Sequence, residues 1–160
     1  MTEKKSKSIK FKSTKGGDFS VNLPKNFKKV KLPFFQKWVE ALESGKYRQC
    51  SNQLCTTVNK KLTYCCLGVL SKIQDRLQKH PDFRMESYCE GTLDRSNPCY
   101  DAISNDGRLP RLVSVAIKDA AYELAEHDFK DTVYSLIDCN DVLGLSFKDI
   151  AKVIHTVYKK

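Results

Sequence analysis

The chain has 160 residues, of which 41% are hydrophobic and 10% aromatic, so it can bury one sizeable core as a single domain. No apolar run reaches the roughly 18 residues that a membrane-spanning helix requires, and no apolar signal-peptide core follows the first residues. These observations exclude a secreted or membrane-spanning protein and predict a cytoplasmic one.

The formal net charge of +9 is concentrated at the start of the chain. Residues 1–31 contain ten lysines against Glu3 and Asp18, which gives +8 and leaves the rest of the chain at +1. The Lys and Ser content predicts a disordered basic arm over residues 1–17, followed by one globular domain over residues 18–160. Two functions stay open for the arm: nonspecific contact with nucleic acid, and simple solubilisation.

The first half of the chain contains signals for both strands and helices. Alternation of Phe19, Val21 and Leu23 predicts a short edge strand. Residues 34–43 have apolar side chains at helical spacing, with Ser-Gly after them as a stop. Residues 46–64 predict a strand or hairpin that turns at its two central lysines.

A second helix is predicted from about Cys65 to Lys79, where apolar side chains repeat on one face before Pro81 ends it. Gly68 lies inside this helix, where it costs about 1 kcal/mol relative to alanine. A glycine at such a position indicates that a neighbouring element packs very close to it.

The second half begins with an irregular segment over residues 80–110, rich in Pro, Asn, Asp, Gly and Ser. Three further helices are predicted after it, over residues 109–124, 128–139 and 146–157. The expected fold is therefore α+β: one mainly helical domain with a small antiparallel sheet and a C-terminal helical hairpin. The side chains expected at its core are Trp38, Leu42, Tyr64, Cys66, Leu70, Ile150 and Ile154.

Four segments match a longer pattern. They read W-x-x-A-L-x-S-G-x-Y-x-Q at 38–49, Y-C-C-L-G-V-L at 64–70, L-P-x-x-V at 109–113 and S-F-x-x-I-A-x-x-I at 146–154. Together they resemble a family of small accessory proteins encoded by tailed bacteriophages. The resemblance implies a protein of the host cytoplasm that counters host defence by binding, either sequestering a nucleotide-like immune signal or blocking a host defence protein.

Metal and thiol chemistry are not favoured by the spacing of the seven cysteines and three histidines. Only Cys50 and Cys55 have a zinc-knuckle spacing, and no second pair accompanies them. Cys65 lies near a helix N-terminus, where His127 or His155 could activate it, but a buried structural thiol is the simpler interpretation. The common hydrolase, phosphate-loop and metalloprotease motifs do not occur. We therefore expect no metal, no cofactor and no catalytic residues, and favour binding over catalysis without excluding an enzyme.

A pocket for an anionic, nucleotide-like ligand is the expected site, because Arg forks suit phosphate oxygens and Tyr rings stack on bases. Nucleic acid bound by the basic arm is the alternative, and a homo-oligomer is compatible with the sequence. The candidate ligand contacts are Arg48, Lys60, Lys61, Arg84, Tyr88, Arg95, Tyr100, Arg108 and Arg111.

Overall fold

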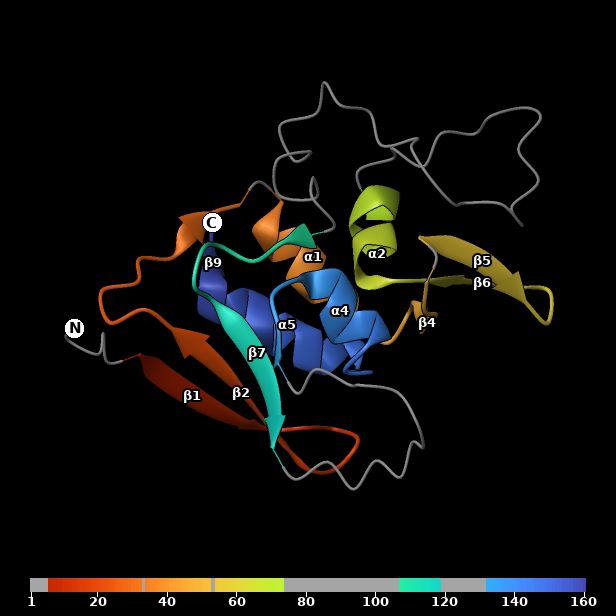
Figure 1. The fold of residues 1–160 in the computed structure, drawn as a ribbon. Helices are drawn as coiled ribbons and strands as arrows, with labels where there is room; N and C mark the ends of the chain where they lie inside the picture. Colours follow the sequence, from red (N-terminus) through yellow and green to blue (C-terminus); the bar gives the residue numbers. More distant parts are fainter. Residues whose placement is uncertain (1–5, 33, 53, 74–106, 119–131) are drawn as a thin grey trace.

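The computed structural model describes residues 6–32, 34–52, 54–73, 107–118 and 132–160 (Figure 1). Helices make up 33% of the structure and strands 32%, so the prediction of a mainly helical domain with one small sheet is wrong. The difference arises because residues 7–12 and 114–118 form strands of one sheet, where the sequence predicted a disordered arm and a helix.

The largest sheet is antiparallel throughout, with strand order β1-β2-β7-β8. Its strands are β1 (Lys7–Lys12), β2 (Asp18–Leu23), β7 (Ser114–Lys118) and β8 (Thr132–Val133). The strand predicted around Val21 exists, but it lies inside the sheet between β1 and β7 and not at an edge. Its inward side chains Phe19, Val21 and Leu23 are buried in the core.

Strand β1 forms within the segment for which the sequence predicted a disordered arm. It pairs with β2 from Lys7 opposite Leu23 to Lys12 opposite Asp18. The alternating apolar residues of β1 explain this pairing, since Phe11 stacks on the Phe19 ring across the strand pair at 5.2 Å between centroids. A lysine-rich composition therefore conceals an amphipathic strand.

Strand β7 also replaces a predicted helix. The segment 109–124 was expected to be helical, but residues 114–118 pair with β2 from one side and β8 from the other. Val113, Ser114 and Val115 are all buried, so the pairing on both sides, and not the burial pattern, identifies this segment as a strand. The helix predicted over residues 128–139 begins only at Leu136, and residues 119–131 lie outside the described residues.

Two smaller sheets complete the described strands. The predicted hairpin near residues 46–64 is confirmed, and its turn places Asn59 and Lys60 at φ of 50° and 63°, as a two-residue hairpin turn requires. The strands of these sheets are β3 (Val30–Lys31) with β9 (Tyr158–Lys159), and β4 (Arg48–Gln49), β6 (Lys61–Tyr64) and β5 (Cys55–Val58).

The helices lie between the β1-β2-β7 strands and the β4-β6-β5 sheet (Figure 1). They are α1 (Phe35–Glu43), α2 (Cys66–Ile73), α4 (Leu136–Asp141) and α5 (Phe147–Val157). All seven predicted core side chains are buried, and the Trp38 indole N–H donates to the Cys66 carbonyl at 2.9 Å. Among the described residues, no helix is long and apolar enough to cross a membrane.

Gly68 marks the closest contact between helix α2 and the chain before β5, as the sequence predicted. A Cβ atom added to Gly68 would lie 1.7 Å from the carbonyl oxygen of Leu54. The same oxygen accepts a hydrogen bond from the Cys65 backbone N–H at 3.2 Å, so it is fixed in place. The glycine is therefore required by the backbone of a neighbouring segment.

We expect Gly68→Ala to destabilise the protein by about 3 kcal/mol, because the Leu54 backbone must move to make room. Helix propensity alone predicts the opposite, a gain of about 1 kcal/mol. Urea unfolding measures the difference. Gly45→Ala is the control: it has no neighbour within 4 Å and meets only the strain of a φ of 72°. A Gly68→Ala protein as stable as the wild type would contradict the close packing.

A buried carboxylate joins the β1–β2 turn to helix α5. The Asp149 side chain is fully buried and accepts hydrogen bonds from the Ser13 hydroxyl at 2.8 Å and the Thr14 backbone N–H at 3.0 Å. The Lys152 ammonium donates to it at 3.0 Å. Burial by itself raises the pKa of Asp149, but hydrogen bonds from Lys152, Ser13 and Thr14 outweigh it and lower the pKa below 3.8.

Replacing Asp149 with Asn should therefore cost about 2 kcal/mol at neutral pH, since several donors lose a charged acceptor. The folded-state pKa lies below the unfolded value, so this stabilisation is present above about pH 4 and disappears as the pH falls through the folded-state pKa. Urea unfolding of both proteins across this range should show their difference narrowing in acid. Asp18→Asn, which removes an exposed carboxylate, should change the stability by less than about 0.5 kcal/mol. A pH-independent difference would exclude this role for Asp149.

Candidate functional site

The structure forms a hollow of about 460 Å³ between the N-terminal hairpin and helix α5, called the basic groove below. This volume is in the range of small-molecule sites. The groove runs beside β1. In the described part of the chain, β1 is one of the two edge strands of the largest sheet (Figure 1). It is lined by Lys7, Ile9, Phe11, Leu23, Pro24, Lys25, Phe27, Lys29, Lys152, His155 and Thr156.

Two periodicities bring these side chains together. Along β1, alternation places Lys7, Ile9 and Phe11 on one face. Along α5, the i, i+3 spacing places Lys152 and His155 on one face. The Asp149 hydrogen bonds hold the turn of the hairpin against the first turn of α5, so both walls of the groove are fixed.

The groove is uniformly basic. Every titratable side chain among the described residues that line it is a lysine or a histidine. Lys152 is paired with Asp149, and its ammonium also donates to the Lys12 carbonyl at 2.8 Å. Lys7, Lys25 and Lys29 are exposed, and within the described part of the chain no ion pair involves them. Three ammonium groups are thus available to an anion from solution.

The floor of the groove is apolar and partly aromatic. Phe11 and Phe27 are half-buried, and Ile9 lies beside them. A turn in which the Phe27 N–H donates to the Pro24 carbonyl at 3.0 Å fixes the loop that carries Phe27. An aromatic floor beneath ammonium groups can hold a planar ring on its surface while the anionic part of the same ligand meets the lysines.

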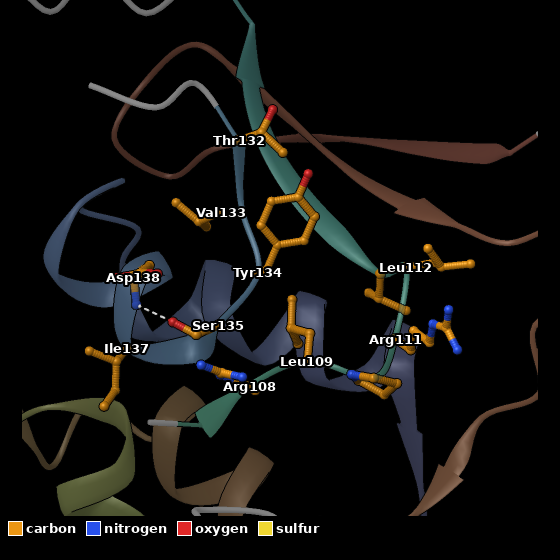
Figure 2. Close-up of a pocket in the computed structure, with 12 residues that line it drawn as sticks. Arg108, Leu109, Arg111, Leu112, Thr132, Val133, Tyr134, Ser135, Ile137 and Asp138 are labelled. Atoms are coloured by element: carbon orange, nitrogen blue, oxygen red, sulfur yellow. Dashed lines mark hydrogen bonds between the residues drawn. The ribbon is translucent and has the colours of Figure 1, made fainter. Parts of the chain in front are cut away.

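A second hollow of about 490 Å³, called the Tyr134 hollow below, lies between the segment before β7 and the segment around β8 (Figure 2). The two segments are joined where the Leu109 N–H donates to the Tyr134 carbonyl at 2.8 Å. The Ser135 hydroxyl accepts from the Asp138 N–H at 3.0 Å and caps helix α4. The hollow is lined by Arg108, Leu109, Pro110, Arg111, Leu112, Val113, Thr132, Val133, Tyr134, Ser135, Ile137 and Asp138.

The predicted ligand contacts are only partly brought together. Arg108 and Arg111 both line the Tyr134 hollow, but Leu109 lies between them and their guanidinium groups do not converge (Figure 2). Arg48, on β4, and the hairpin lysines are exposed and line neither hollow. The hairpin lysines are Lys60 and Lys61, and the predicted contacts outside the described residues are Arg84, Tyr88, Arg95 and Tyr100.

The described thiols near the core have the properties of structural groups. Burial raises the pKa of Cys65 to about 12, and it raises that of Cys66 well above the ordinary value. The Cys66 thiol donates to the Leu136 carbonyl at 3.5 Å. His155, one proposed activator, packs edge-on against Phe35 and lines the basic groove. His127 lies outside the described residues.

The basic groove itself was not predicted from the sequence, although signals for it exist. Residues 7–12 read K-S-I-K-F-K, in which apolar and basic residues share one strand. The high lysine content suggested disorder, and this obscured the alternation of Ile9 and Phe11. On α5, nothing in the local sequence shows that a distant hairpin lies opposite His155.

Comparison with known proteins identifies a family. A family model described as a domain of unknown function, DUF8296, matches residues 29–158. The match includes α1, α5 and the whole Tyr134 hollow, whereas β1 and β2 precede it. No curated protein and no solved structure matches the chain. Because the match covers most of the sequence, the chain belongs to the DUF8296 family.

Proposed function

We propose that the protein is a non-enzymatic binding protein that holds an anionic, nucleotide-like ligand in the basic groove. The observation that carries this proposal is the combination of available ammonium groups with an aromatic floor. Lys7, Lys25 and Lys29 supply the charge, and Phe11 and Phe27 supply the apolar surface. The proposal keeps the ligand class expected from the sequence and moves it to a different part of the fold.

The chemistry of the groove suits a ligand with one charged and one planar part. Lysine ammonium groups act as point charges on phosphate oxygens and impose little geometry, so they accept linear and cyclic phosphates alike. A purine or pyrimidine ring can stack on Phe27 or Phe11, since each base has an apolar face. Binding without turnover requires no further group, and the ligand is released intact.

The resemblance to tailed-phage accessory proteins supports a biological setting for this activity. In that setting the protein acts in the host cytoplasm and counters host defence by sequestering a nucleotide-like immune signal. Sequestration is stoichiometric, so its effect depends on affinity and on the amount of protein made. An intact ligand recovered after binding would agree with this role, and a converted ligand would indicate an enzyme.

The first test is a thermal-shift screen of the full chain with nucleosides and with linear and cyclic nucleotides. We expect stabilisation by phosphate-bearing compounds and none by nucleosides. A ligand at 100 times its dissociation constant should add about 2.7 kcal/mol to the unfolding free energy. Lys25→Glu/Lys29→Glu should abolish the shift, because it places carboxylates at the anion site.

The matched control is Lys60→Glu/Lys61→Glu, which makes the same charge change at the tip of the β5–β6 hairpin. It should leave the nucleotide shift unchanged. If both double variants lose the shift equally, the effect is one of overall charge and the groove is not the site. If no nucleotide stabilises the wild type, the proposed function is wrong.

Nucleic acid is a second candidate ligand, favoured by exposed lysines that continue beyond the groove. Lys10 and Lys12 lie on the other face of β1, Lys28 lies between β2 and β3, and Lys31 is on β3. A polyanion can contact such a surface without base recognition, because each neutralised phosphate releases counterions. The lysines belong to a folded hairpin and loop, so their positions relative to one another are fixed.

Lys10→Glu/Lys12→Glu separates the two candidates. If nucleic acid is the ligand, this change should weaken binding of short DNA and RNA and reduce the slope of log affinity against log salt by about two. If a single nucleotide is the ligand, its affinity should be nearly unchanged, since these side chains do not line the groove. Fluorescence anisotropy at several salt concentrations measures the affinity for nucleic acid, its dependence on salt, and the affinity for a labelled nucleotide.

A further inference from the structure

The Tyr134 hollow carries two exposed apolar side chains. Leu112 is 63% exposed and Tyr134 is 60% exposed, the highest values among the large hydrophobic residues that the structure shows exposed. They come from different segments, the turn before β7 and the link between β8 and α4, and line one hollow (Figure 2). Because both side chains line the same hollow, an apolar group bound there could contact the two of them together.

The backbone at Leu112 strengthens this interpretation. The backbone φ of Leu112 is 67°, in the left-handed region. This region is unfavourable for leucine because its Cβ atom comes too close to a backbone carbonyl oxygen. The turn is closed by the Val113 N–H, which donates to the Pro110 carbonyl at 3.0 Å. Glycine or asparagine would suit this position better and would not expose an apolar side chain to water. A strained, exposed leucine indicates that its side chain has a role outside the fold.

The charges around the hollow define what it can bind. Arg108 and Arg111 are exposed, and Asp138 is the acidic side chain in the lining. The formal charge of the lining residues is therefore +1. In Figure 2 the two arginines lie on either side of Leu109. Each guanidinium can pair with a carboxylate. Two separated forks suit carboxylates spaced along an extended chain better than they suit one phosphate group.

We propose that the Tyr134 hollow docks a segment of another protein, an acidic stretch with a large apolar side chain flanked by carboxylates. The apolar side chain packs against Leu112 and Tyr134, and the carboxylates pair with Arg108 and Arg111. Tyrosine and arginine dominate the energetics of protein interfaces, which fits this lining. The hollow shares no lining residue with the basic groove, so this docking is independent of the anion site.

Leu112→Gly is the most informative variant, because it removes the docking side chain and relieves the backbone strain. Glycine adopts a positive φ without a steric penalty, so the melting temperature should stay the same or rise. A loss of binding in this variant therefore cannot be explained by a damaged fold. Tyr134→Ala removes the second apolar contact, and Arg111→Glu reverses one charge.

The experiment is a selection from a random-peptide display library with the full chain as bait. Enriched sequences should place a large apolar residue between Asp or Glu residues. Fluorescence anisotropy should show that Leu112→Gly and Tyr134→Ala each bind such a peptide about tenfold more weakly than the wild type, or weaker still. Arg111→Glu should also weaken it. Lys25→Glu/Lys29→Glu should leave the affinity unchanged, which separates this site from the basic groove.

Three outcomes would overturn the proposal. One is a selection that enriches no acidic, apolar sequence. Another is a peptide that binds Leu112→Gly and Tyr134→Ala within about twofold of the wild type, since the hollow then does not hold it. The third is a peptide that depends on Lys25 and Lys29, because it then occupies the basic groove through charge alone.

Discussion

One buried carboxylate attaches the N-terminal hairpin of this protein to helix α5. Asp149 lies in the first turn of α5 and accepts hydrogen bonds from the β1–β2 turn, more than a hundred residues earlier in the chain. The hairpin is therefore attached to the helix at its turn, and the basic groove lies between them. These hydrogen bonds fix the hairpin turn against α5, in addition to the packing of Phe19 and Val21 in the core. The attachment converts a basic sequence into a basic site.

The parts of the fold that the sequence predicts well are those with strong local signals. Helix α5 has a capping serine and a buried stripe that repeats every three or four residues, and both are visible within residues 146–157. The β5–β6 hairpin is similar, since its partners are adjacent and its turn is short. Gly68 is a further case, because a glycine inside a helix indicates a close neighbour even when the neighbour is unknown.

The parts that the sequence predicts poorly depend on distant partners. Strand β7 has a pattern compatible with helix or strand, and only pairing with β2 decides between them. Strand β1 has two apolar residues, too few to distinguish it from a solvated tail. The candidate site has the same limit: Arg108 and Arg111 were predicted and share a hollow, whereas Lys25 and His155 line one groove because of tertiary packing that no local pattern encodes.

The position of β2 in the centre of the sheet has a consequence for the order in which the protein folds during synthesis. Phe19 and Val21 leave the ribosome early, but their strand partner β7 and the helix that carries Lys152 are made much later. A two-stranded hairpin alone is marginally stable, so the nascent chain exposes an apolar strand until the last third of the protein has been made. Lysines on an edge strand discourage pairing with other chains. Strand β1 has three lysines, Lys7, Lys10 and Lys12, and places their charge at an edge of the sheet.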